Sequence, residues 1–134
     1  NFEGPLAGLL RAFEYSKDIP VLVVPCDAPF LSPALAIRLL QSYKGTKTSA
    51  VIPHDGDRLQ PLFGLYAPDV VSSLTKYLAS GQRKVETWVT ALPHAVVDFS
   101  NEKESFMNIN TESDLQAAQS ILHSAMHEEA PHAE

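Results

Sequence analysis

Asp27 has the strongest case for chemistry in the 134-residue sequence. It follows residues 19–24, an apolar run rich in β-branched side chains that predicts a strand. In open α/β sheets, ligands bind beyond the carboxyl ends of the strands. Pro25 and Pro29 stiffen the loop around Asp27, and a carboxylate held there suits Mg²⁺, which completes its shell with phosphate oxygens and water. The alternative is an aspartate that only bonds the backbone of its own turn.

Two further groups of residues could contact a substrate. Asn108 and Asn110 are two positions apart, so in an extended segment their amides point the same way and could bind a substrate or ligate a cation. Asparagine is also common in turns for structural reasons alone. Gly4, Pro5 and Gly8 lie where a helix is predicted to begin, so backbone amides there could approach a phosphate. Most such turns only start a helix.

The remaining candidates have simpler interpretations. Arg83 and Lys84 are adjacent bases that could hold a substrate phosphate, and a solvated helix end explains them equally well. His54 and Asp55 are interpreted as turn formers. Cys26 is interpreted as a small buried thiol, because no arrangement for nucleophilic catalysis can be argued around it.

The charged residues are unevenly distributed. All 10 basic residues lie at or before Lys103, together with 10 of the 16 acidic residues, so the body of the chain is neutral. The six acidic residues that produce the net charge of −6 all follow Lys103, namely Glu104, Glu112, Asp114, Glu128, Glu129 and Glu134. A surface without clustered Lys and Arg argues against nucleic-acid binding. His123 and His127 are four positions apart but lack a supporting carboxylate pattern, and they stay unassigned.

The composition indicates one soluble domain. A hydrophobic fraction of 45% in 134 residues is ample for a packed core. The apolar run at residues 19–24 is far shorter than the roughly 20 residues that cross a bilayer, so no membrane association is expected. A single cysteine excludes an internal disulfide and a multi-thiolate metal site, and it makes a cytoplasmic location the default.

The apolar patterns predict helices that alternate with strands, which is typical of an α/β layered sheet. Strands are predicted at residues 19–24, 48–53, 59–66 and 94–99, and the first lacks polar alternation, as in a strand buried on both faces of a parallel sheet. Residues 54–57 supply hairpin turn chemistry, so the sheet is expected to be mixed. Helices are predicted at residues 5–16, after an N-cap at Ser32, at 68–78 and 83–92, and after residues 111–114, where Leu115, Ala118, Ile121 and Leu122 form an apolar stripe.

These pieces resemble the molybdenum cofactor guanylyltransferase family in order and spacing. The resemblance runs from about residue 3 to residue 122 and rests on Gly4-Pro5-Leu6-Ala7-Gly8-Leu9, Pro25-Cys26-Asp27-Ala28-Pro29, Gln60-Pro61, Gly81-x-Arg83-Lys84-Val85 and Phe106-Met107-Asn108-Ile109-Asn110-Thr111. The Cys-Asp-x-Pro form favours the guanylyl branch over the related cytidylyl and sugar-nucleotide transferases.

The resemblance implies a Rossmann-like nucleotidyltransferase fold, a three-layer α/β sandwich whose mostly parallel sheet carries a hairpin. Residues 1–122 would be the middle and C-terminal part of that single domain, and residues 123–134 a solvated tail. The family's N-terminal strand, its glycine-rich loop and the lysine that grips the triphosphate have no counterpart in this sequence. The chain alone is therefore expected to be inactive.

The resemblance also implies a reaction, the transfer of GMP from GTP to molybdopterin with release of pyrophosphate. Asp27 would bind Mg²⁺ and the nucleotide as the catalytic residue, beside nucleotide-binding Gly4, Pro5 and Gly8. Arg83, Lys84, Asn108 and Asn110 would bind the pterin substrate. Molybdoenzymes or their chaperones are candidate partners. The alternatives are a cytidylyl or sugar-phosphate nucleotidyltransferase and a non-catalytic pterin-binding module.

Overall fold

The computed structural model describes residues 4–108 and 112–129, with side chains as far as His123. Helices and strands alternate, as the apolar patterns predict. In chain order, the elements are α1 (Pro5–Tyr15), β1 (Val21–Leu22), α2 (Leu35–Gly45), β2 (Ala50–His54), the 3-10 helix η1 (Pro61–Phe63), β3 (Leu65–Tyr66), the 3-10 helix η2 (Pro68–Val70), α3 (Val71–Ala79), α4 (Val85–Thr90), β4 (His94–Asp98), the 3-10 helix η3 (Ser100–Phe106) and α5 (Glu112–Glu129).

The described strands form one mixed sheet in the order β1-β3-β2-β4. β2 and β4 run parallel over five residues, from Ala50 opposite His94 to His54 opposite Asp98. β3 is antiparallel to both β1 and β2 because it returns through the predicted hairpin. The α/β class and the hairpin are confirmed, but only one of these three strand pairs is parallel, so the described sheet is less parallel than expected.

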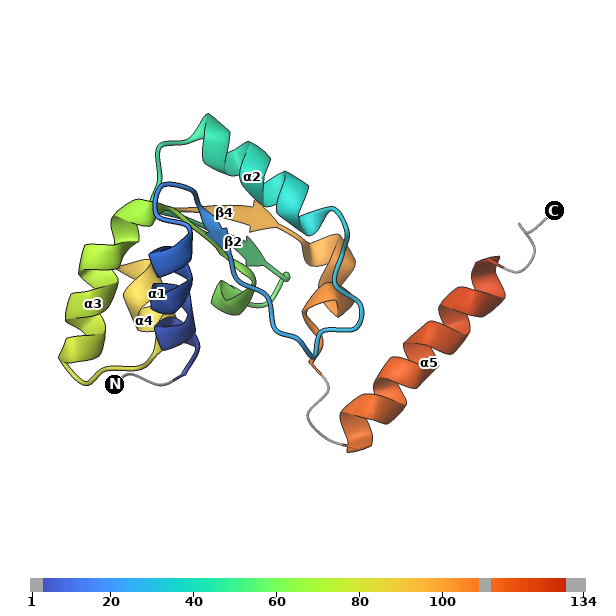
Figure 1. Cartoon of the computed structure of the whole chain (residues 1–134). Coiled ribbons are helices and arrows are strands. Elements are labelled where there is room, and N and C mark those ends of the chain that lie inside the picture. The colour runs from blue at the N-terminus through green and yellow to red at the C-terminus, as the bar shows by residue number, and fades with distance from the viewer. Residues whose placement is uncertain (1–3, 109–111, 130–134) are drawn as a thin grey trace.

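Side chains of the central strand alternate between two hydrophobic cores. Ala50 and Ile52 face a core that α1, α3 and α4 cover, and Val51 faces a second core beside α2 and η3. Successive residues of a strand point to opposite faces, so a strand covered by helices on both sides is apolar throughout. Ala50, Val51 and Ile52 are all fully buried. The three layers are therefore helices, sheet and helices (Figure 1).

Two predicted strands are shorter than expected. β1 keeps only two residues, and Ile19 and Val24 are exposed, so the prediction of a strand buried on both faces is wrong for the described chain. The reason is that β1 pairs on one side only, with β3. The strand predicted at residues 59–66 is interrupted by η1, which begins at Pro61, a residue without the backbone N–H that a ladder requires.

The helix predictions are largely confirmed. α1, α3 and α4 begin and end within a few residues of the expected positions, and α2 begins shortly after Ser32, whose Oγ accepts a bond from the Ala34 amide at 3.2 Å. α5 begins where expected but continues to Glu129, into residues predicted to form a tail. The apolar stripe of α5 is only partly covered, since Leu115 and Leu122 are exposed where the helix extends away from the sheet (Figure 1). No helix within residues 4–108 and 112–129 is long and apolar enough to cross a bilayer.

Candidate functional site

Asp27 lies in the turn between β1 and α2, where the sequence predicted it. Its side chain is half-buried, and within residues 4–108 and 112–129 the carboxylate has no hydrogen bond or ion pair. The alternative in which Asp27 bonds its own turn is therefore not what this structure shows. The neighbouring Cys26 is exposed, so its interpretation as a buried thiol is wrong. Both residues follow the end of a strand on the molecular surface, where no core is available to a thiol.

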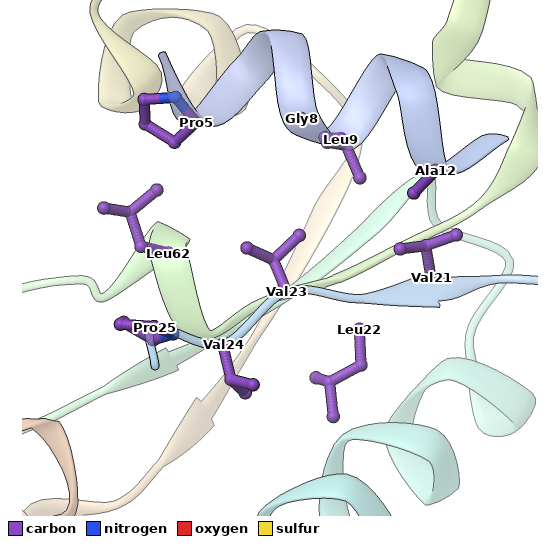
Figure 2. A pocket seen from close by; sticks show the side chains of 10 residues that line it. All are labelled: Pro5, Gly8, Leu9, Ala12, Val21, Leu22, Val23, Val24, Pro25 and Leu62. Carbon is purple, nitrogen blue, oxygen red and sulfur yellow. The ribbon is translucent and has the colours of Figure 1, made fainter. Parts of the chain in front are cut away.

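Pro5 and Gly8 line a cavity of about 430 Å³ between α1 and β1. Figure 2 shows side chains of α1 facing those of β1 and of Leu62 across this space. Pro25, two positions before Asp27, also lines it, so the structure brings the predicted glycine-containing turn and the predicted aspartate loop together. Gly4, which precedes α1, has a φ of 91°, a backbone conformation that favours glycine.

Asn108 lines a second cavity of about 320 Å³. Residues from three separate segments surround this space, namely Arg58, Leu59, Gln60, Pro61, Leu62, Phe63, Val85, Glu86 and Asn108. Leu62 of η1 lines both cavities, so the expected nucleotide side and the expected pterin side adjoin at this residue. Asn110 lies outside the described residues, and its predicted role stays a prediction.

Arg83 and Lys84 lie in the turn between α3 and α4 and line neither of these cavities. Nη1 of Arg83 donates to the carbonyls of Leu78 at 3.1 Å and Gln82 at 2.8 Å, so this guanidinium is tied to the backbone at the end of α3 and in the turn that follows it. The Tyr77 hydroxyl donates to the Lys84 carbonyl at 2.7 Å. The side chain of Lys84 is exposed. Their binding of a substrate phosphate stays a prediction.

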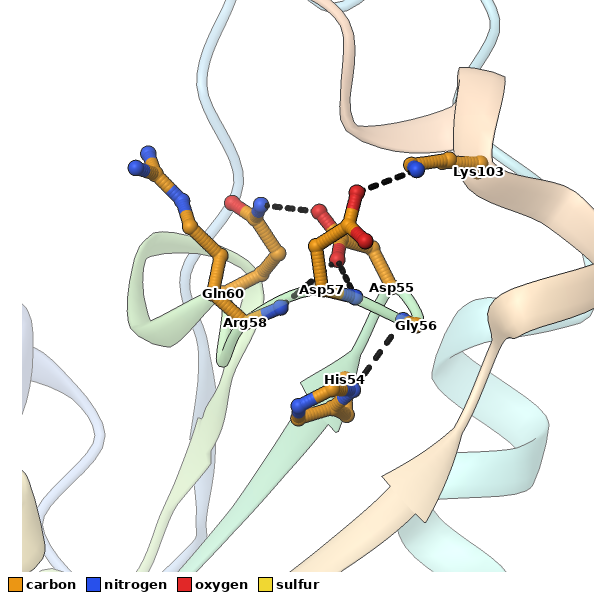
Figure 3. A network of polar contacts seen from close by, with 7 residues as sticks. All are labelled: His54, Asp55, Gly56, Asp57, Arg58, Gln60 and Lys103. Carbon is orange, nitrogen blue, oxygen red and sulfur yellow. Dashed lines mark hydrogen bonds and ion pairs between the residues drawn. The ribbon is translucent and has the colours of Figure 1, made fainter.

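The hairpin turn holds a buried carboxylate that the sequence interpretation treated only as a turn former. Oδ1 of Asp55 accepts the backbone N–H groups of Asp57 at 2.7 Å and Arg58 at 2.9 Å, and Gly56 N–H donates to Nδ1 of His54 at 3.0 Å. The turn role of His54 and Asp55 is thus confirmed. Oδ2 of Asp55 also accepts Nε2 of Gln60 at 2.8 Å (Figure 3). This second role, fixing a side chain of the cavity wall, is the one that sequence reasoning missed.

The hydrogen bonds of this turn keep Asp55 ionised. Burial raises the pKa of the carboxyl group, but the donors from Arg58, Asp57 and Gln60, with the nearby charge of Lys103, outweigh burial and lower the pKa overall. Lys103 also forms an ion pair with Asp57 (Figure 3), which raises the pKa of the lysine. An ionised Asp55 can only accept hydrogen bonds.

Asp55→Asn is expected to lower the free energy of unfolding by about 1 kcal/mol at pH 7, because hydrogen bonds to a charged acceptor are stronger than neutral ones. The folded pKa lies below the unfolded value of about 3.9. The carboxylate's contribution is therefore complete above about pH 5 and is lost as the pH falls through the folded pKa.

Urea titrations of the whole protein at several pH values measure this effect. The difference between wild type and Asp55→Asn is expected to be constant from about pH 5 to 7 and to shrink in acid. Asp18→Asn is the matched control, since Asp18 is exposed and has no polar partner in the described part of the chain. A difference that stays constant down to pH 2 would contradict the assignment.

The described residues fit a magnesium ion that takes one protein carboxylate and obtains its other ligands from substrate and water. Within the described ranges, no group of three or more His, Cys, Asp or Glu side chains could hold a metal. Asp27 offers one carboxylate without a competing partner there. Mg²⁺ is commonly bound in this way, with substrate phosphates and water as the other ligands.

A family model described as "MobA-like NTP transferase domain" matches residues 1–96. The chain belongs to the MobA-like NTP transferase family. The matched residues include the cavity between α1 and β1, Asp27, and the turn that contains Asp55. Asn108 lies beyond the matched residues. The family predicted from the motifs is thereby confirmed.

Individual relatives of this MobA-like chain agree with the family match. It is 37% identical over 111 residues to a molybdenum cofactor guanylyltransferase of Shewanella sp. (strain MR-4), covering 83% of this chain and 56% of the relative. For the protein of the same name from Histophilus somni (strain 2336), identity is 36% over 121 residues, with 90% and 62% covered.

A solved structure matches the MobA-like chain as well. The molybdopterin-guanine dinucleotide biosynthesis protein A of Archaeoglobus fulgidus superposes with a TM-score of 0.76 and 27% identity, covering 89% of this chain and 63% of that one. The chain thus spans less than two thirds of the length of each of these three relatives.

Proposed function

We propose that the whole protein transfers GMP from GTP to molybdopterin and releases pyrophosphate. The observation that carries this proposal is the match, over 83% and 90% of the chain, to two proteins named molybdenum cofactor guanylyltransferase. The geometry supports a reaction of two substrates, because two cavities share Leu62, one lined by Pro5 and Gly8 and the other by Asn108.

The proposed chemistry needs no side-chain nucleophile. An oxygen of the terminal molybdopterin phosphate attacks the α-phosphorus of GTP, a new P–O bond forms, and the bond between the α-phosphorus and the bridging oxygen breaks. The electron pair leaves with pyrophosphate. Such a transfer depends on aligning the two reacting groups and offsetting their negative charge.

The chain's own residues have distinct tasks in this scheme. Asp27 holds Mg²⁺, which when bound supplies positive charge to the phosphate oxygens. Pro5 and Gly8 lie where the nucleotide would approach the start of α1. Asn108 lines the cavity assigned to the pterin, and Arg83 and Lys84 offer positive charge for its phosphate. A cytoplasmic location fits this role and stays a prediction.

The test is a product assay with the whole protein, GTP labelled at the α-phosphate, molybdopterin and Mg²⁺. Label is expected in a dinucleotide product, with one pyrophosphate released for each transfer, and omission of molybdopterin should stop both. Preference for CTP would favour a cytidylyltransferase, and transfer to a sugar phosphate would favour the sugar-nucleotide branch. Binding of molybdopterin without any transfer would indicate a pterin-binding module. Each of these three results would contradict the proposal.

A further inference from the structure

The 3-10 helix η1 forms part of the wall of both cavities. Leu62 lines the cavity between α1 and β1 together with Pro25, which lies two positions before Asp27. Pro61, Leu62 and Phe63 all line the second cavity. A shift of this short helix would therefore change the shape of both spaces at once. The contacts that fix the position of η1 thus matter for a ligand in either cavity.

Three hydrogen bonds hold the N-terminal end of η1. The helix begins after Gln60, whose backbone N–H donates to the carbonyl of Pro53 at 2.8 Å. The side chain of Gln60 adds a second bond, because its Nε2 donates to Oδ2 of Asp55 at 2.8 Å (Figure 3). The hydroxyl of Tyr66 donates to the carbonyl of Pro61, the first residue of η1. Two of the three bonds are thus made by side chains that lie outside η1.

The Asp55 carboxylate is held in place by its own turn. It is 8% exposed, and its Oδ1 accepts the backbone N–H groups of Asp57 and Arg58. Lys103, from η3, lowers the pKa of Asp55 further through its charge. An ionised carboxylate can only accept hydrogen bonds, so Oδ2 holds the amide of Gln60 with its NH₂ group toward Asp55.

The Tyr66 hydroxyl comes from the packed core. The side chain is buried, and its ring stacks on that of Trp88 with centroids 5.6 Å apart. Trp88 is fixed in turn, because its Nε1 donates to Oγ of Ser73 at 3.0 Å. Both side chains that bind η1 therefore start from buried groups with partners of their own.

We propose that Asp55, acting through Gln60, and Tyr66 are positioning residues for the transfer reaction, because they hold η1 where the two substrates can be aligned. This inference rests on the proposed function, which assigns one substrate to each cavity. Asp55 and Tyr66 line neither cavity, so their effect reaches the substrates through η1. Alignment contributes strongly to such reactions, and a misplacement of about 1 Å can cost about 100-fold in rate.

Gln60→Glu in the whole protein tests the bond to Asp55, because it sets a second carboxylate against the first. Two carboxylates at this distance repel each other, and the pKa of one of them rises. At pH 8, kcat for release of pyrophosphate is expected to fall at least about tenfold, with a smaller change in the Michaelis constants. Relative to wild type, activity should recover as the pH falls toward about 6, when the two carboxyl groups share a proton.

The double variant Asp55→Asn/Gln60→Glu exchanges carboxylate and amide between the two positions. The total charge then equals that of wild type, and the hydrogen bond forms in the opposite direction. We expect kcat within about threefold of wild type, without the pH dependence of Gln60→Glu alone. Gln41→Glu, at an exposed position on α2, is the matched control for the added charge and should change neither constant.

Tyr66→Phe tests the second bond, because it keeps the ring on Trp88 and removes only the donor to Pro61. It should lower kcat about threefold to tenfold, again with a smaller change in the Michaelis constants. If Gln60→Glu does not fold, Gln60→Met, which removes the amide without adding charge, takes its place with the same fall in kcat of about threefold to tenfold.

Urea titrations identify the conditions in which each variant is fully folded, and kcat is compared only there. A residue that merely stabilises the fold would leave kcat of the fully folded variants unchanged, and that result would overturn this inference alone. A double variant as slow as Gln60→Glu would overturn it as well. A wild-type protein that transfers no GMP would contradict the proposed function and, with it, this inference.

Discussion

Asp27→Asn is expected to lower Mg²⁺-dependent transfer of GMP by at least about 100-fold in the whole protein, a loss similar to that from removing other preorganised electrostatic groups. Asparagine keeps the shape of the side chain but replaces a charged oxygen ligand with a neutral amide, which a hard cation binds less well. Asp27 has no competing partner in the described residues, so the lost charge has no other structural task there. Release of pyrophosphate at saturating GTP measures the effect.

The dependence on magnesium separates a metal ligand from a structural residue. A lost ligand should move half-maximal activity to higher Mg²⁺ concentrations, whereas damage to the loop should lower activity equally at every concentration. Asp18→Asn makes the same charge change at an exposed position and should leave the titration unchanged. Wild-type turnover by Asp27→Asn, or an unshifted titration, would exclude Asp27 as the ligand.

Gly64→Ala is expected to lower the free energy of unfolding by up to about 3 kcal/mol, the cost of forcing extra volume into a packed core. A methyl group at this position would lie 2.8 Å from Cδ1 of Ile52 and 3.0 Å from the hydroxyl oxygen of Tyr66. Both neighbouring side chains are fully buried, so either must shift within the packed core to admit the methyl group. The Tyr66 hydroxyl also donates to the carbonyl of Pro61, so the strain reaches η1. Denaturant unfolding of the whole protein measures the loss.

A double-mutant cycle tests the stated cause. Ile52→Val removes the methyl group that Gly64→Ala would strike, and alone it should cost about 0.5–1.5 kcal/mol. The double variant should be more stable than the sum of the two single losses predicts, because one change makes room for the other. Gly45→Ala is the control, since a methyl group there would meet nothing within 4 Å. Strict additivity would show that the clash with Ile52 is not the source of the loss.

The sequence predicted the layers of the fold better than the lengths of its strands. Residues 50–52 form an uninterrupted apolar run inside the strand predicted at residues 48–53, and that strand forms with helices on both faces. The run at residues 19–24 looks the same, yet only Val21 and Leu22 form β1. Strand pairing is a property of neighbours in space, so a run of residues cannot by itself reveal whether a partner lies on each side.

The candidate site was predicted in the same uneven way. Asp27 could be found because prolines flank it after an apolar run, and Asn108 because two asparagines recur at a short spacing. Gln60 could not be given a role from sequence, since its role depends on a carboxylate five positions earlier that the hairpin turn brings to 2.8 Å. For Arg83 the sequence suggested a phosphate ligand, whereas the folded chain shows hydrogen bonds from its guanidinium to the carbonyls of Leu78 and Gln82. Those bonds depend on how the chain turns after α3 and cannot be inferred from the sequence.

Leu62 gives the molecule a shared wall between its two cavities. A ligand that displaces this side chain toward one cavity enlarges the space on the other side by the same movement. Because thermodynamic coupling is reciprocal, whatever the first ligand does to the affinity of the second, the second does equally to the first. Any ligand that moves Leu62 in one cavity would therefore change the affinity of the other cavity for its own ligand, and the effect would be equal in both directions.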